Sequence, residues 1–96
     1  ASAVLSLKSF NFDLAFMGAN GVDINGYSTP DSEEALIKSE AASKANKTYF
    51  LCDESKFTKK SLINFYNLED SYLITNAKEI NEDIKSKLKG LYIVNW

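Results

Sequence analysis

The sequence predicts an α/β domain in which helices flank a mainly parallel sheet. Two observations carry this prediction. Residues 12–19 and 47–53 are nearly continuous apolar stretches, and helical patterns lie between and after them. Unbroken apolar stretches of this length are typical of strands that are covered on both faces of a parallel sheet. With 96 residues, the chain supports one compact core.

The chain is expected to begin with a helix, a strand and a loop. Residues 2–10 have the apolar spacing of the end of a short helix, and the strand over residues 12–19 follows. Residues 20–31 are rich in glycine, asparagine and hydroxyl side chains, which predicts an irregular loop. Loops of this length inside a compact domain often carry function.

A long helix is predicted from about residue 30 to residue 46. Thr29 and Pro30 form its start signal, because a threonine hydroxyl can cap a helix and the fixed φ of proline suits a first turn. Most apolar positions of this helix are alanines, so it can pack closely against a sheet. The strand over residues 47–53 follows.

The second half of the chain predicts two candidate strands, a helix and a closing strand. The candidate strands cover residues 61–67 and 71–76, and the closing strand covers residues 91–96. A helix is expected over residues 77–90, with early acidic residues, late lysines and Gly90 as its stop. The apolar stripe of that helix consists of Ile80, Ile84, Leu88 and Leu91. The resulting order, α-β-α-β-(β)-β-α-β, predicts parallel strands joined by right-handed crossovers.

The composition limits the kinds of partner. The formal net charge is −2, and all eleven basic residues are lysines, which does not favour direct binding of nucleic acid. Without histidine and with one cysteine, the chain can form neither a zinc site nor an intramolecular disulfide, and Cys52 is expected to be a small buried hydrophobe. No apolar stretch approaches the roughly 20 residues of a membrane span. We therefore expect a cytoplasmic protein without a cofactor, a metal or a membrane partner.

Two predicted strands end in residues that suit a ligand. Ligands of open parallel sheets bind beyond the carboxyl ends of the strands, and both ends should lie on one edge. After the first strand, glycines allow a close approach of the backbone, and an amide and a carboxylate can recognise sugar hydroxyls. After the second strand, a carboxylate and an ammonium follow. These residues are Gly18, Asn20, Gly21 and Asp23 in the first segment, and Asp53 and Lys56 in the second.

Simpler interpretations of both segments stay open. The first can be a plain turn that requires small residues, and the second can be an Asx turn beside a surface lysine. Nucleophilic catalysis finds little support, because the chain has no histidine to act as a base. General-base chemistry by a carboxylate remains possible if several of the following meet in space: Asp13, Asp23, Glu33, Glu34 and Asp53.

Residues 12–57 resemble the effector-binding domain of DeoR-type bacterial transcriptional regulators. The resemblance lies in an Asp before an apolar strand, the turn "GANGVD", a later Gly and Ser, a helix with "EALIK", and a strand followed by "DESKF". The matching positions are Asp13, residues 18–23, Gly26, Ser28, Glu34 and Ala35 with Lys38, and residues 53–57. The stretch "LEDSYLITN" is similar to a later part of the family, although Asn76 replaces a more usual aspartate.

The resemblance implies a sensor for a phosphorylated sugar, related to the ribose-phosphate isomerase and CoA-transferase superfamily. It implies a ligand site made of Gly18, Asn20, Gly21, Asp23, Gly26, Lys38, Asp53 and Lys56. In the isomerases two aspartates and a glutamate transfer protons, and the corresponding positions here hold Met17, Asn20 and Lys38. Because these three side chains cannot replace a carboxylate base, the resemblance implies that the domain is not an enzyme.

The resemblance also implies a larger protein. We expect the chain to be a partial domain, about the C-terminal half of a sensor, with DNA binding supplied by an N-terminal helix-turn-helix domain outside it. A homo-oligomer is expected as well. Two alternatives remain: an enzyme like the sugar-phosphate isomerases, and an oligomerisation module without a ligand.

Overall fold

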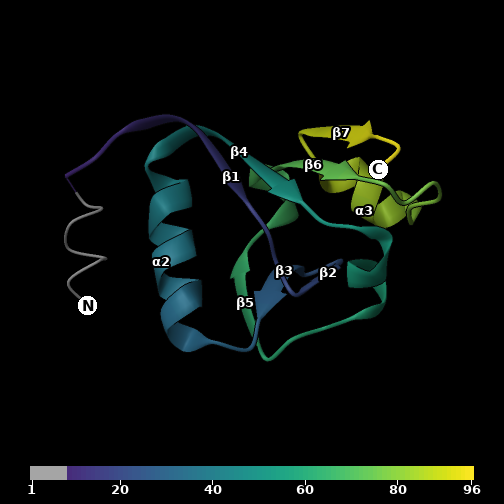
Figure 1. Ribbon diagram of the computed structural model, residues 1–96, viewed down its shortest axis with the longest axis horizontal. Helices are drawn as coiled ribbons and strands as arrows, with labels where there is room; N and C mark the ends of the chain where they lie inside the picture. The colour runs from purple at the N-terminus through teal and green to yellow at the C-terminus, as the bar shows by residue number, and fades with distance from the viewer. Residues whose placement is uncertain (1–8) are drawn as a thin grey trace.

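The computed structural model describes residues 9–96, so the helix expected over residues 2–10 lies almost entirely outside the described residues. Four parallel strands form the larger sheet, in the order β1-β4-β6-β7 (Figure 1). Their bounds are Phe12–Met17 for β1, Ala45–Leu51 for β4, Tyr72–Thr75 for β6 and Gly90–Ile93 for β7. The predicted α/β class with a mainly parallel sheet is confirmed.

A second, antiparallel sheet has the order β2-β3-β5, with β2 at Gly21–Asp23, β3 at Gly26–Thr29 and β5 at Ile63–Tyr66. The expectation of an irregular loop over residues 20–31 is therefore wrong, because most of that segment is the β2–β3 hairpin. An Asp23 carboxylate oxygen accepts a hydrogen bond from the Asn25 backbone amide at 2.8 Å, and Gly26 has a φ of +110°. A glycine with positive φ after a short turn is a known way to close a hairpin.

Helix α2, Ser32–Ser43, begins later and ends earlier than the predicted helix. Asp31 is its N-cap in place of Thr29, since the Asp31 carboxylate accepts hydrogen bonds from the amides of Glu33 and Glu34 at 2.9 and 3.2 Å. The alanine-rich side faces the interior, as expected from the sequence. Ala35 and Ala42 are the buried residues of the helix.

Helix α3, Glu82–Lys87, is much shorter than the helix expected over residues 77–90. It begins no earlier because Asn81 has a non-helical backbone, with φ −50° and ψ 131°, and is the N-cap: its side-chain oxygen accepts a hydrogen bond from the Asp83 amide at 2.7 Å. Gly90 belongs to β7 and not to a helix stop. The predicted apolar stripe nevertheless faces the core: Ile84 is buried, and Ile80, Leu88 and Leu91 pack against the core. None of the helices described in residues 9–96 is long and apolar enough to cross a membrane.

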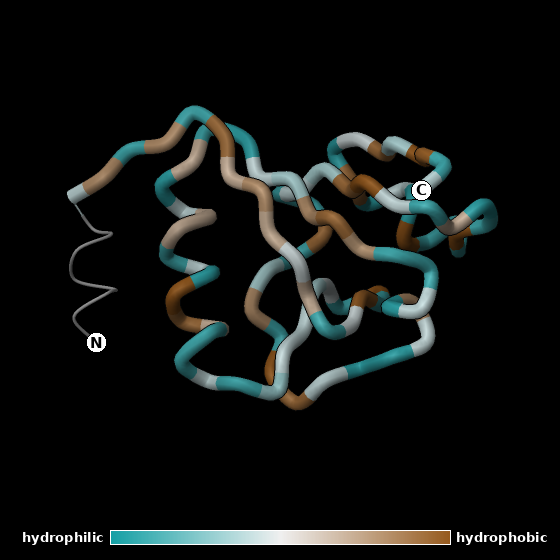
Figure 2. The backbone as a smooth tube through the Cα atoms, in the orientation of Figure 1, coloured by the Kyte–Doolittle hydropathy of each residue, from teal (hydrophilic) through white to brown (hydrophobic). Residues whose placement is uncertain are grey.

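The core lies between the two sheets. The rings of Phe50 and Tyr27 stack with centroids 3.6 Å apart, and both residues are fully buried. The Tyr27 hydroxyl shares a hydrogen bond of 2.8 Å with Ser71 Oγ, and burial raises the Tyr27 pKa well above its usual value. Two short 3-10 helices, η1 at Glu54–Thr58 and η2 at Leu68–Asp70, complete the described elements. Figure 2 shows hydrophobic stretches along the strands of the larger sheet.

Strand β1 is not covered on both faces. Its apolar sequence predicts a strand with both faces buried, but Leu14 and Phe16 are 48% and 60% exposed. Ala15 and Met17, on the opposite side, are half-buried, and Met17 packs against the core. The parallel sheet therefore has one face toward the core and one face in solvent.

Candidate functional site

The turns that follow β1 and β4 lie side by side at the carboxyl edge of the parallel sheet. The register pairs Met17 with Phe50, so residues 18–20 run beside residues 51–53. A backbone hydrogen bond joins Ala19 to the Cys52 thiol. The expectation that the two strand ends share one edge is correct.

The segment after β4 is fixed by its own side chains. The Asp53 carboxylate accepts hydrogen bonds from both the hydroxyl and the backbone amide of Ser55, which caps η1. The hydrogen bond from the Ser55 side chain is the largest cause that lowers the pKa of Asp53, so the carboxylate stays ionised at neutral pH. The Glu54 amide donates to Asn76 Oδ1 at 2.9 Å and links this segment to the end of β6.

Lys38 reaches the same edge from α2. Its ammonium donates to the Gly18 carbonyl oxygen at 2.9 Å and pairs with Glu34 Oε1 at 2.6 Å. It also lies 5.7 Å from the centroid of the Phe65 ring. Because an ammonium has three donors, one N–H of Lys38 remains for a ligand. Lys38 therefore holds the Gly18 turn against α2 while it contributes positive charge to the edge.

Lys56 contributes a second ammonium to this edge. It lies in η1, and its charge acts on both Asp53 and the Cys52 thiol. Within residues 9–96 its ammonium forms no ion pair. Lys56 is a half-buried residue, and an ammonium without an ion-pair partner is suited to an anionic ligand group.

The remaining predicted residues support the hairpin. Asn20 is exposed, and its backbone N–H donates to the Ser28 carbonyl oxygen at 2.9 Å. A Cβ on Gly21 would overlap the Lys59 backbone, so this position requires glycine. Gly26 lies against the Tyr66 carbonyl at the far end of the hairpin. The structure thus brings Gly18, Lys38, Asp53 and Lys56 together, with Asn20 close along the chain, and Gly26 lies elsewhere.

Asp23 faces a different hollow. Besides its bond to Asn25, it lines a shallow concavity together with Phe57 and residues of the first part of α3, including Ile84. The five carboxylates considered for general-base chemistry do not assemble into one site. Within residues 9–96 no group of three or more His, Cys, Asp or Glu side chains could hold a metal ion.

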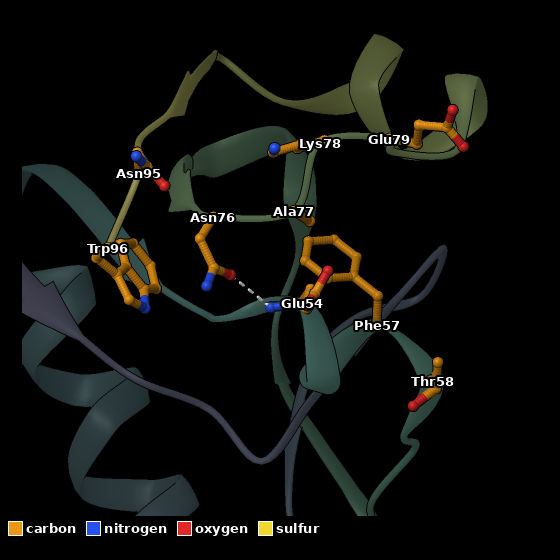
Figure 3. Close-up of a pocket in the computed structure, with 9 residues that line it drawn as sticks. All are labelled: Glu54, Phe57, Thr58, Asn76, Ala77, Lys78, Glu79, Asn95 and Trp96. Atoms are coloured by element: carbon orange, nitrogen blue, oxygen red, sulfur yellow. Dashed lines mark hydrogen bonds between the residues drawn. The ribbon is translucent and has the colours of Figure 1, made fainter.

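A concavity of about 570 Å³ lies next to η1, at the ends of β4, β6 and β7 (Figure 3). The Asn76 side chain lies between Glu54 and Trp96 in this view, and its oxygen makes the hydrogen bond to the Glu54 amide. The sequence prediction missed this hollow. Each lining segment follows a strand, so the rule that ligands bind beyond the carboxyl ends of parallel strands could have indicated it. The lining residues are Glu54, Phe57, Thr58, Asn76, Ala77, Lys78, Glu79, Asn95 and Trp96.

Cys52 is fully buried beneath this edge, as predicted from the sequence. Burial is the main cause that raises its pKa to about 11, from 9.0. The thiol ionises at a lower pH in the unfolded chain than in the folded domain. The contribution of Cys52 to the free energy of unfolding is therefore fully present below pH 9, and about 2 kcal/mol of it is lost as the pH rises toward 11. Urea unfolding at pH 8 and pH 10.5 measures this loss. Cys52→Ala should remove most of it, and an equal loss in that variant would contradict the assignment to Cys52.

Comparisons with known proteins place the chain in a family. The family model of the DeoR C terminal sensor domain matches residues 1–77. FruR of Bacillus subtilis, described as an uncharacterized HTH-type transcriptional regulator, is 37% identical over 84 residues, which are 85% of this chain and 34% of FruR. The HTH-type transcriptional regulator GlpR of Haloferax volcanii is 32% identical over 85 residues, which are 88% of this chain and 33% of GlpR.

A third relative, the lactose phosphotransferase system repressor of Streptococcus mutans, is 30% identical over 90 residues, which are 93% of this chain and 36% of the repressor. The chain thus spans about a third of the length of these relatives. No solved structure matches the chain. The matched domain is a sensor and the relatives are transcriptional regulators, which agrees with the expectation that the domain is not an enzyme. The chain belongs to the DeoR family of transcriptional regulators, within its C-terminal sensor domain.

Proposed function

We propose that this domain binds a phosphorylated sugar at the carboxyl edge of β1 and β4. The observation that carries the proposal is the meeting of the residue 18–20 turn with residues 53–56, where the Lys56 ammonium has no carboxylate partner within residues 9–96. An ammonium without an ion-pair partner suits a phosphate group. The ionised Asp53 and the exposed Asn20 amide suit the hydroxyls of a sugar.

In this proposal the neighbouring concavity binds the sugar part of the ligand. It adjoins η1 through Glu54 and Phe57, and its volume of about 570 Å³ is within the range of small-molecule sites. Asn76 contributes an amide group there, and the hydrogen bond to Glu54 fixes its side chain. A ligand whose phosphate meets Lys56 could therefore extend its hydroxyls toward Asn76.

In this proposal Lys38 mainly positions the turn. Two of its donors already contact Gly18 and Glu34, so it offers one N–H and its charge to the phosphate. Gly21, Asp23 and Gly26 act through the hairpin that supports the turn. The isomerase alternative has no observation in its favour, since the matched family consists of regulators.

The role of the whole protein follows from the family. We propose a cytoplasmic repressor of sugar metabolism whose DNA-binding part lies outside this domain, as the names of the helix-turn-helix relatives suggest. One relative is named as the repressor of a lactose phosphotransferase system, which supports a sugar-derived effector. The effector would change DNA binding only if it binds one of the two states of the protein more tightly.

Titration calorimetry of the domain with a panel of hexose and pentose phosphates tests the proposal. We expect at least one sugar phosphate to bind, and Lys56→Ala to weaken binding by about tenfold or more, because a charge-assisted hydrogen bond to phosphate is lost. Lys85→Ala, an exposed lysine of α3, is the matched control and should leave affinity unchanged. Equal loss in both variants, or no binding by any sugar phosphate, would refute the proposed site.

A further inference from the structure

Trp96 forms one wall of the hollow beside η1. It is the single tryptophan of the chain, and 57% of its surface is exposed. The sheet fixes its position, because the pairing of β6 with β7 continues past β7 through a hydrogen bond of 2.8 Å from the Val94 amide to the Thr75 carbonyl oxygen. Asn95 and Trp96 therefore lie beside Asn76, and all three line the hollow.

The hollow combines aromatic walls with a polar side chain between them. Figure 3 shows the Trp96 indole and the Phe57 ring on opposite sides of Asn76. Phe57 packs against the core, which holds its ring in place. The Asn76 oxygen accepts the hydrogen bond from the Glu54 amide, so the NH₂ group of Asn76 remains for a ligand. Apolar walls with a few placed polar groups are typical of small-molecule sites.

The charges of the hollow suit the uncharged part of a sugar phosphate. Its lining includes the carboxylates of Glu54 and Glu79 and one ammonium, that of Lys78. Within residues 9–96 the Glu54 carboxylate forms no ion pair, so it is an acceptor without a competing cation. Carboxylates accept hydrogen bonds from sugar hydroxyls and repel a phosphate. The phosphate therefore lies at Lys56, and the sugar extends into the hollow.

From these observations we infer that Trp96 selects the ring form of a phosphorylated sugar by stacking against one face of the ring. The inference rests on the proposed function and adds to it a specificity-determining residue and a form of the ligand. A sugar ring presents C–H groups together on a nearly flat face, and contact with the indole removes apolar surface of both from water. The hydroxyls point outward from the ring, where Asn76 and Glu54 offer a donor and an acceptor.

An open-chain sugar phosphate suits this wall less well. The C–H and O–H groups of an open chain rotate about each carbon–carbon bond, so the chain presents no lasting flat apolar face to the indole. Ordering such a chain on binding also costs conformational entropy that a ring has already lost. The ring form should therefore bind more tightly, although both forms offer the same phosphate to Lys56.

The fluorescence of Trp96 tests the inference, because no other tryptophan contributes to the emission. For the sugar phosphate of the panel that binds most tightly, two analogues are compared: the anhydroalditol phosphate, which is locked as a ring, and the alditol phosphate, which is locked as an open chain. We expect the ring analogue to shift the emission of Trp96 and to bind about tenfold more tightly than the open chain. Inorganic phosphate alone should leave the emission unchanged, because it reaches Lys56 and not Trp96.

Substitutions at Trp96 separate stacking from other contacts. By calorimetry, Trp96→Ala should weaken binding of the ring analogue by about tenfold and binding of the open chain by less than about twofold, while Trp96→Phe should keep most of the affinity. Tyr92→Ala is the matched control, because Tyr92 is an aromatic residue of β7 that is 49% exposed and does not line the hollow. Circular dichroism checks that each variant is folded.

Equal affinity for the two analogues, or an unchanged emission at saturation with the ring analogue, would overturn the inference, whereas the binding itself would still support the sugar-phosphate site. An equal loss for both analogues in Trp96→Ala would overturn it as well, because Trp96 would then not distinguish a ring from a chain. The absence of binding by any sugar phosphate would refute the proposed function and the inference with it. If Trp96→Ala does not fold, the emission and the two affinities of the unchanged chain decide the matter.

Discussion

Replacing Phe50 with alanine is expected to lower the free energy of unfolding by about 3–5 kcal/mol. Phe50 is fully buried and lies in β4, an inner strand of the parallel sheet. Its ring stacks on Tyr27 and lies 5.9 and 5.6 Å from the rings of Phe65 and Tyr66 of the second sheet. Truncation would therefore remove the contact that joins the two sheets and leave a cavity between them.

Urea unfolding followed by circular dichroism measures this loss. Because a small domain has only about 5–15 kcal/mol of stability in total, Phe50→Ala should be close to unfolding at room temperature. Leu62→Ala is the control, since Leu62 is 86% exposed and should change stability by less than about 0.5 kcal/mol. A loss of less than about 1 kcal/mol in Phe50→Ala would show that the two sheets do not share this core.

The second large effect is expected for Gly26→Ala, with a loss of about 2 kcal/mol or more. At a φ of +110° a side chain strains the backbone, and a Cβ would also overlap the Tyr66 carbonyl. Gly18→Ala is the matched control, because its Cβ would lie 3.8 Å from the nearest atom, the Leu51 carbonyl oxygen. Thermal unfolding of both variants tests the difference.

The Gly26→Ala variant also tests whether Gly26 supports the fold or contacts the ligand. Gly26 is a ligand residue in the sequence prediction, but it lies at the far end of the hairpin from the β1 and β4 edge. We expect folded Gly26→Ala to keep the sugar-phosphate affinity of the unchanged chain. A normally stable Gly26→Ala variant with weakened binding would restore Gly26 to the ligand site.

The sequence predicted the parallel sheet well because its strands carry their own signal. Apolar stretches locate β1 and β4 within about two residues, and the shared edge of their turns follows from parallel pairing. The hairpin carries a weaker signal, since β2 and β3 are short and consist largely of glycine and polar residues. Burial of Val22 and Tyr27 against the larger sheet stabilises it, and this is a tertiary effect. The Asn25 and Gly26 pair is the local signal that could have revealed the turn.

The sequence predicts where the candidate site lies but not the contacts between its residues. The sequence places Lys38 on a helix and Gly18 at a strand end, but the bond between them depends on how α2 packs. The ion pair of Lys38 with Glu34 needs only helical spacing, because the two residues are four positions apart in α2. In the sequence Asn76 stands out only as a departure from the family pattern, and its hydrogen bond to the Glu54 amide depends on the tertiary structure. The exposure of one face of the parallel sheet depends on the order of the strands, which periodicity does not determine.

The most direct test of the central claim is a map of backbone amide shifts in the nuclear magnetic resonance spectrum of the domain as a sugar phosphate is added. The proposed site predicts the largest shifts at residues 18–20, 53–57 and Asn76, and small shifts at β5 and α3. Inorganic phosphate alone should move the amides near Lys56 only weakly. Largest shifts outside the carboxyl edge, or no shifts with any sugar phosphate of the panel, would contradict the claim that this edge senses the effector.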